Sequence, residues 1–245
     1  MDYQGFTAEL VGQLGADTRA IGLVAVGSMA AIDYEPDEWS DHDFFVITAA
    51  GGQEELRRDL SWLPRHDEIA LSFQETAHGL KVLYDDGHLL EFAVFDLEEI
   101  GLAGVNRYRM LLDRGGVEER MREVAARPRE KPPDEHLFGM FVTSVQVGVG
   151  RTRRGERLSG AFFAVWGARY LCALLARVLP APERALLDDL DALRRFERVY
   201  PELGAEIRSA LDDPQALLAL AERELRPPLP DLPWRALEAM RARIS

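Results

Sequence analysis

Residues 79–96 read GLKVLYDDGHLLEFAVFD, and this stretch decides how the first half of the chain folds. Two arms rich in β-forming residues flank Asp86-Gly87, a dipeptide typical of tight hairpin turns. In the second arm the side chains alternate between the two faces of the strand, so Glu91 shares a face with Phe95. A charged side chain in so apolar a strand is costly unless a cation meets it. The hairpin therefore predicts a strand that carries a functional carboxylate.

Two segments upstream read as further strands of the same sheet. Residues 21–26, IGLVAV, form a compact apolar run that ends at Gly27-Ser28, and residues 41–48, DHDFFVIT, are rich in β-forming residues. Helices are expected over residues 6–20 and 52–63, and a last short strand over residues 109–113. Helix and strand therefore alternate through the first half of the chain.

The character of the sequence changes at residues 127–135, RPREKPPDE, a charged and proline-rich linker candidate. Beyond it, helices are expected over residues 135–151, 156–179, 183–198, 202–211, 214–224 and 233–243. We therefore expect an α+β fold in two domains. Residues 1–127 would hold a small mixed β-sheet flanked by helices, and residues 128–245 would be all helical.

Composition narrows the function classes. The net charge of -13 disfavours a broad nucleic-acid footprint and would attract a small cation, although such acidity more often serves solubility alone. The single cysteine, Cys172, excludes an internal disulfide and a multi-thiolate zinc site. The apolar segment 161–179 is interrupted by Arg169 and Arg177, which favours a buried helix over a membrane span. With no secretory signal in the first residues, we expect the cytoplasm and no membrane partner.

Three acidic residues form the informative constellation. Asp41 and Asp43 are two residues apart at the head of a strand, so their side chains point to one face, and Glu91 comes from another strand. Carboxylate oxygens are the ligands that magnesium prefers, and two-metal sites place such ions about 3.5–4 Å apart. We expect the three carboxylates to converge free of salt-bridge partners. Ser28 is expected to cap a following helix whose free N–H groups bind a phosphate.

Each of these features has an ordinary alternative. Gly27-Ser28 after a strand is usually a simple turn, and an Asp-x-Asp pair is more often a solvated strand end. Glu91 could pair with an arginine or lie at the rim of the sheet. It is their joint occurrence, in this order and in strand contexts, that favours a phosphate-transferring metal site.

Other candidate residues receive structural interpretations. The five histidines lack zinc-ligand spacing, and His42, between the two aspartates, is expected to face away from them. Trp39 and Trp62 could stack on a nucleobase, but core or rim packing is favoured. Arg57 and Arg58 are expected on an exposed helix face.

Five segments together resemble a known family. They are VAVGSMA (24–30), DEWSDHDFFVIT (37–48), LYDDGHLLEFAVFDLEEI (83–100), LLDRGG (111–116) and GRTRRGERLSGA (150–161). In this order they resemble the polymerase-β-like nucleotidyltransferases, and in particular the streptomycin-modifying 6-adenylyltransferases among the aminoglycoside adenylyltransferases. The resemblance covers roughly residues 20–180. It implies a nucleotidyltransferase domain over 1–127 and a helical substrate-binding domain over 128–245.

The resemblance also implies roles for individual residues. Asp41 and Asp43 would ligate two Mg²⁺ ions and the nucleotide phosphates, and Glu91 would complete the catalytic and metal-binding triad. Gly27 and Ser28 would hold the terminal phosphates of ATP.

Further roles fall in the helical half. Glu156 matches a carboxylate that could deprotonate the acceptor hydroxyl, with charge complementarity at a helix N-terminus as the equally weighted alternative. Arg151, Arg153 and Arg154 could approach the phosphates, with Arg154 the favoured cofactor contact, or could form a solvated basic turn.

Two departures from the family pattern are evident. Met29, Ala30 and Ala31 stand where relatives carry an arginine and then a polar residue, which would weaken triphosphate binding or shift it to other arginines. Glu91 stands where this branch usually has aspartate, a ligand one methylene shorter.

The resemblance implies transfer of AMP from ATP to a hydroxyl of a small cationic acceptor such as an aminoglycoside, an antibiotic-resistance activity. Two alternatives stay open. One is a nucleotidyltransferase that modifies a protein or RNA, as in toxin–antitoxin pairs, and the other is a non-catalytic nucleotide-binding module. The partners expected are a nucleoside triphosphate and a small-molecule acceptor, with nucleic acid disfavoured and the protein a monomer or homodimer.

Overall fold

The computed structural model describes residues 2–32, 35–128 and 130–244 and divides into two compact units, Met1–Pro128 and Arg129–Ser245. The first unit combines a sheet with helices and the second is helical, so the fold is α+β with a mixed sheet, as predicted. Within the predicted linker 127–135, residue 129 lies outside the described residues.

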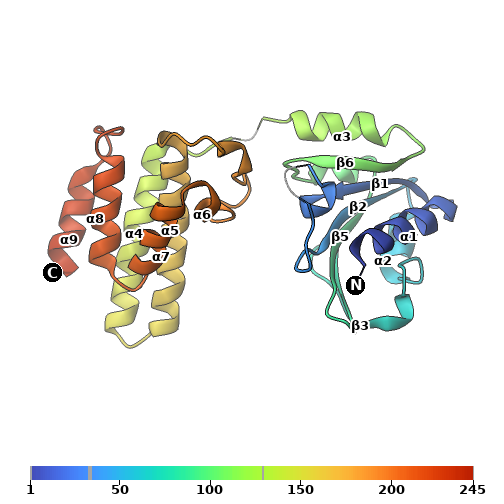
Figure 1. The fold of residues 1–245 in the computed structure, drawn as a ribbon, viewed down its shortest axis with the longest axis horizontal. Helices are drawn as coiled ribbons and strands as arrows, with labels where there is room; N and C mark the ends of the chain where they lie inside the picture. Colours follow the sequence, from blue (N-terminus) through green and yellow to red (C-terminus); the bar gives the residue numbers. More distant parts are fainter. Residues whose placement is uncertain (1, 33–34, 129, 245) are drawn as a thin grey trace. The chain divides into compact units, whose positions relative to one another are not determined.

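The sheet of the first unit has six strands in the order β3-β4-β5-β2-β1-β6 (Figure 1). Strands β2 and β5 run parallel, and the other neighbouring pairs run antiparallel. The strand bounds are Ala20–Val26 (β1), His42–Thr48 (β2), Ile69–Gln74 (β3), Gly79–Tyr84 (β4), Leu89–Asp96 (β5) and Tyr108–Asp113 (β6). The predicted hairpin is β4-β5, and the Gly87 N–H donates to the Tyr84 carbonyl across its turn.

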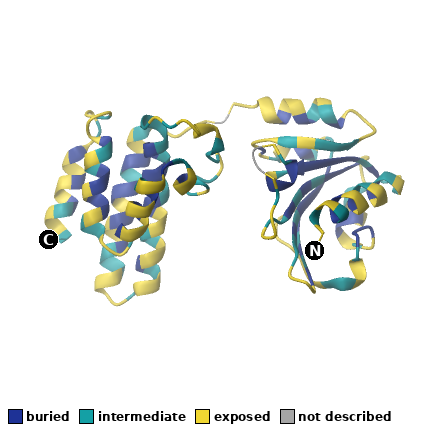
Figure 2. Ribbon diagram, in the orientation of Figure 1, coloured by how far each residue is buried: buried dark blue, intermediate teal, exposed yellow. Residues whose placement is uncertain are grey.

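Helices cover both faces of this sheet. Helices α1 (Tyr3–Ala16) and α2 (Gln53–Arg58) pack on one face, where Phe44, Leu90 and Phe92 are buried with residues of both helices. Helix α3 (Val117–Ala126) packs on the other, over the side chains of Ile47, Ala93 and Phe95. The alternation predicted for the second hairpin arm is therefore confirmed. The central strands are dark in Figure 2 because both of their faces are covered.

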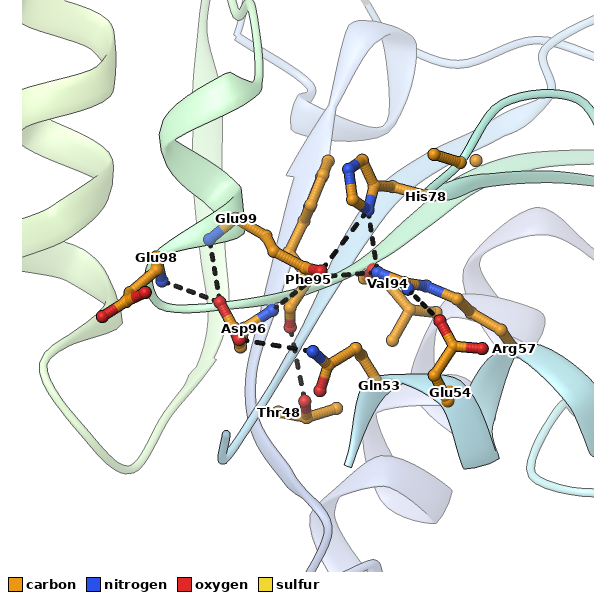
Figure 3. A network of polar contacts seen from close by, with 12 residues as sticks. Thr48, Gln53, Glu54, Arg57, His78, Val94, Phe95, Asp96, Glu98 and Glu99 are labelled. Carbon is orange, nitrogen blue, oxygen red and sulfur yellow. Dashed lines mark hydrogen bonds and ion pairs between the residues drawn. The ribbon is translucent and has the colours of Figure 1, made fainter. Parts of the chain in front are cut away.

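A buried arginine fastens the end of β5 to its surroundings (Figure 3). The Arg57 side chain is 6% exposed and donates to the Val94 carbonyl, and its guanidinium also pairs with Glu54 at 2.6 Å and Glu99 at 2.8 Å. His78 Nδ1 lies 2.9 Å from the same guanidinium. The prediction that Arg57 lies on an exposed helix face is wrong, because a strand carbonyl and two carboxylates draw it inward.

The second unit is built on a long antiparallel helix pair, α4 (Asp134–Arg153) and α5 (Arg157–Val178). A Cβ on Gly148 of α4 would come within 3.2 Å of the Gly160 carbonyl oxygen of α5, so the two backbones approach closely. The remaining helices are α6 (Phe196–Val199), α7 (Pro201–Ala210), α8 (Pro214–Leu225) and α9 (Trp234–Ile244). Short 3₁₀ turns lie at Gly27–Ala30, His66–Glu68, Glu99–Leu102 and Arg184–Leu186.

Helix α5 is, among the described residues, the one helix long and apolar enough to cross a membrane by length and composition. In the structure its C-terminal half lies in the core, because Leu171, Cys172 and Leu175 are buried against the other helices of the unit. Its N-terminal half exposes large apolar side chains, among them Phe162 and Val165. Burial raises the pKa of the Cys172 thiol to about 12. The cysteine is therefore an inert core residue.

Several elements differ from the sequence-based expectations. The helix expected over 52–63 ends at Arg58, where Asp59 turns back to accept the Ser61 N–H. The helix expected over 183–198 is mostly turns, because Asp188 accepts the N–H groups of Leu190 and Asp191 and so competes with helical bonding. Strand β3 and helix α3 were not anticipated.

Candidate active site

The three acidic residues come together near the N-terminal ends of the two central strands, β2 and β5. Asp43 lies in β2 and is paired in parallel register with Glu91 of β5, and Asp41 precedes β2 directly. One carboxylate oxygen from each residue lies within 4.8 Å of the others, and all three residues are partly exposed. Among the described residues, no other group of three acidic, histidine or cysteine side chains gathers in this way. The donor set is all oxygen, which fits a hard divalent cation such as Mg²⁺.

Two hydroxyl groups fix the backbone beside the triad. The Tyr3 hydroxyl donates to the Asp41 carbonyl at 2.9 Å, and the Ser28 hydroxyl donates to the same oxygen at 3.2 Å. Ser28 is 3% exposed, so this contact is shielded from water. The peptide of Asp41 is therefore held from α1 and from the turn after β1, which restrains where its carboxylate can point.

The turn after β1 brings glycine backbone against the triad. Gly27 has φ of +53°, a left-handed conformation that favours glycine. A Cβ built on Gly27 would come within 3.1 Å of the Asp43 carboxyl carbon and 3.2 Å of its Cβ. Residue 27 must therefore lack a side chain if Asp43 is to keep its position.

The expected helix after Gly27 does not form. Gly27–Ala30 is a single 3₁₀ turn, the Ser28 side chain makes no cap, and Ala31 adopts a left-handed conformation with φ of +50°. The expectation that Ser28 caps a phosphate-binding helix is wrong, because its hydroxyl is drawn to the Asp41 carbonyl instead. Met29 and Ala30 are buried, which accounts for their apolar character.

Glu91 has a cationic partner that sequence reasoning missed. Lys81 of β4 is paired with Glu91 across the hairpin, and its Nζ lies 2.7 Å from Glu91 Oε1 and 3.1 Å from Glu75 Oε1. Hydrogen bonds to Glu91 and then Glu75 raise the pKa of Lys81, so it is charged at neutral pH. The expectation of a carboxylate free of salt bridges is therefore wrong for Glu91. Lys81 and Glu91 each lie five positions from Asp86 in the turn, and symmetry about that residue is a signal that could have found the pair.

His42 points to the opposite face from the two aspartates, as expected. Its ring stacks on Tyr3 at 3.8 Å between centroids, Nε2 lies 2.9 Å from the Thr7 hydroxyl, and Nδ1 lies 2.7 Å from His88 Nε2. Burial, with a smaller contribution from His88, lowers the pKa of His42 to about 3, so the ring is neutral. His42 is thus a packing group behind the site.

The two tryptophans differ in exposure. Trp62 is buried in the core of the first unit and donates its indole N–H to the Leu56 carbonyl at 2.9 Å. Trp39, in the segment that leads into Asp41, is 87% exposed. Trp62 therefore packs in the core, while Trp39 offers a free ring face to solvent.

Glu156 lies in the helical unit, at the N-terminal end of α5. Its carboxylate accepts hydrogen bonds from Arg151 at 2.5 Å and from Arg154 at 3.2 Å. The Arg151 contact first, and then the Arg154 contact, lower the pKa of Glu156. The side chain is ionised at neutral pH, and its arginine partners reduce its strength as a base.

Two hollows lie within the helical unit. One, of about 720 Å³, is lined in part by Arg151, Arg153, Arg154 and Arg243. The other, of about 370 Å³, is lined mainly by apolar side chains of α4, α5, α8 and the α7–α8 connection. The wall of the first contains four arginines, two of which pair with Glu156, and the wall of the second is mainly apolar.

Comparisons with known proteins find several similar solved structures, among them the following two. No family model matches the chain, and no curated protein matches it. An aminoglycoside 6-adenyltransferase from Bacillus subtilis is similar over 99% of this chain and 92% of its own, at 9% identity and a TM-score of 0.33. A nucleotidyltransferase-like protein from Exiguobacterium sibiricum is similar over 98% of this chain and 87% of its own, at 15% identity and a TM-score of 0.29. At such low identities and TM-scores neither likeness carries a functional conclusion, which must come from the site.

Proposed function

We propose that this chain is a magnesium-dependent nucleotidyltransferase that moves AMP from ATP to a hydroxyl of a small cationic acceptor of the aminoglycoside type, with release of pyrophosphate. The observation that supports this most strongly is the gathering of the Asp41, Asp43 and Glu91 carboxylates, with ligand atoms within 4.8 Å of one another. Gly27 backbone lies directly against one of them. Binding of a nucleoside triphosphate requires metal ions that neutralise its charge and backbone N–H groups that its phosphates can approach closely.

Within this proposal, Asp41, Asp43 and Glu91 would hold two Mg²⁺ ions. Bound magnesium neutralises triphosphate charge and favours ionisation of an attacking hydroxyl. The chain contributes preorganisation: parallel strands fix Asp43 opposite Glu91, and the Tyr3 and Ser28 hydroxyls fix the Asp41 peptide. The bare backbone at Gly27 would meet the terminal phosphates, with Ser28 contributing its main chain because its hydroxyl is already engaged.

Glu156 is proposed as the group that accepts the proton of the acceptor hydroxyl, and Arg154 as a contact to the nucleotide. Glu156 is ionised at neutral pH, as a proton acceptor must be, but its lowered pKa makes it a weak base. Substitution of Glu156 with Gln should therefore reduce kcat less than substitution of Asp43 with Asn. A larger loss in E156Q than in D43N would contradict this ranking.

The direct test is incubation with [α-³²P]ATP, Mg²⁺ and a panel of aminoglycosides. We expect label on a small molecule, and at least a roughly 100-fold loss in D41N, D43N and E91Q, comparable to the loss of a preorganised electrostatic group in other enzymes. Nucleotide-dependent thermal stabilisation with no labelled product under any condition would contradict transferase activity and leave a nucleotide-binding module.

One observation favours a second acceptor class. The larger hollow of the helical unit is walled by arginines, which suit an anionic acceptor such as RNA or an acidic protein segment better than a cationic drug. The net charge of -13 opposes an extended nucleic-acid footprint. Label appearing on RNA or protein, and on none of the aminoglycosides, would select this second candidate.

The cellular setting follows from the chemistry proposed. ATP is a cytoplasmic substrate and Mg²⁺ a cytoplasmic cofactor, and the C-terminal half of α5 packs in the core of its unit, so we propose a cytoplasmic enzyme. We also propose that it is monomeric or homodimeric. Fractionation and sedimentation of the full chain test both points. Recovery in the membrane fraction would contradict the first.

A further inference from the structure

Lysine is rare in this chain, and one of its lysines touches the proposed metal site. The sequence holds 29 basic residues, of which only Lys81 and Lys131 are lysines. Lys131 pairs with Asp189 at 3.6 Å, with both side chains 70% exposed. Lys81 instead lies between Glu91, at 2.7 Å, and Glu75, at 3.1 Å, with its own side chain 26% exposed.

The Lys81 ammonium is a group that another cation can displace from Glu91. An ammonium is a compact charge on a flexible stem, whereas a guanidinium would bind a carboxylate through a rigid two-bond fork. Lys81 also has a second carboxylate partner in Glu75, so its charge stays paired if the contact to Glu91 opens. Glu91, which is 37% exposed, can therefore exchange its lysine for another cation without leaving a buried charge unpaired.

We propose that Lys81 is a displaceable counter-ion for Glu91, one that neutralises this carboxylate while no divalent cation is bound and competes with the cation for it. This rests on the proposed function, because it takes Glu91 as a metal ligand. Metal affinity of the protein alone is then lower than three carboxylates would otherwise give.

The experiment is a Mn²⁺ titration of the nucleotide-free full chain, followed by the electron paramagnetic resonance signal of free Mn²⁺. K81M keeps most of the apolar stem and should tighten binding by roughly 1.5- to fivefold, the range expected for loss of one exposed ion pair. K81R keeps the charge and should bind no more tightly than wild type. K131M removes one positive charge at the other lysine and should leave Mn²⁺ affinity unchanged.

K81M in an E91Q background distinguishes competition for Glu91 from a general effect of the lysine charge on cation binding. If Lys81 acts through Glu91, the gain from K81M should largely disappear when Glu91 is replaced. An equal gain in both backgrounds, or no gain in K81M with wild-type thermal stability, would overturn the proposal while leaving the metal site intact. If neither the wild type nor K81M binds Mn²⁺, the proposed function fails, and the role of Lys81 fails with it.

Discussion

Replacement of Gly27 with Ala tests whether the site tolerates a side chain at residue 27, next to the Asp43 carboxylate. The new methyl group would lie 3.1 Å from the Asp43 carboxyl carbon and in contact with Asp43 Oδ2, so the carboxylate must move or the turn must open. The left-handed φ of +53° adds a backbone penalty of roughly 1 kcal/mol for any residue with a Cβ. We therefore expect a modest loss of stability and a large loss of site function.

The expected size of the functional loss comes from geometry. A displacement of a reacting group by about 1 Å can cost on the order of 100-fold in rate. AMP transfer and Mn²⁺ affinity should both fall in G27A, while chemical unfolding shows a stable, cooperative fold.

Gly51 provides a matched control, since its φ is +87° and a Cβ there would meet nothing within 4 Å. G51A should lose comparable stability and keep wild-type Mn²⁺ affinity and AMP transfer. Wild-type Mn²⁺ affinity in G27A, or an equal loss of affinity in G51A, would refute the steric reasoning.

Two further predictions concern stability. R57M should lower the free energy of unfolding by about 3 kcal/mol, because the Val94 carbonyl and the Glu99 carboxylate lose a buried cationic partner. R58M is the control, since the Arg58 side chain is 81% exposed. Equal unfolding free energies for R57M and R58M would contradict the buried network. Acid should also destabilise the protein through His42, whose folded pKa of about 3 lies below its ordinary value of 6.5. Between pH 6.5 and 3 the unfolded chain binds a proton at His42 and the folded protein does not. The stability that neutral His42 contributes is therefore fully present above pH 6.5, and it falls by about 1.4 kcal/mol for each pH unit between pH 6.5 and 3. Denaturant unfolding at pH 7.5 and 5.5 measures it, and an H42N variant with the same pH dependence as wild type would show that His42 is not the cause.

The convergence of the triad could be predicted because it depends on local rules. Two-residue alternation places Asp41 and Asp43 on one side of β2, and the turn at Asp86-Gly87 sets the phase of Glu91 in β5. The parallel pairing of β2 with β5 then aligns Asp43 with Glu91. Only that last step is a property of the whole sheet.

The parts that could not be predicted depend on partners distant in sequence. Ser28 fails to cap a helix because the Asp41 carbonyl, thirteen residues away, accepts its hydroxyl. Arg57 is buried because Val94 and Glu99, from another part of the chain, accept its hydrogen bonds.

Strand β3 was missed for a different reason. Its sequence carries a strand signal that could have found it, because Ile69, Leu71 and Phe73 recur at every second position. Leu71 and Phe73 are nevertheless half exposed, because β3 lies at the edge of the sheet. Its pairing with β4 shows only once the hairpin is in place.

The most direct test of the central claim is the divalent-cation affinity of the triad itself. Calorimetric titration of Mn²⁺ into the wild-type protein should show saturable binding, and D43N should weaken it by at least about tenfold, since loss even of an outer-shell partner commonly costs that much. D67N, which alters an exposed carboxylate of the 3₁₀ turn His66–Glu68, should bind as wild type does. Equal Mn²⁺ affinity in wild type and D43N would contradict the claim that Asp41, Asp43 and Glu91 form a metal site.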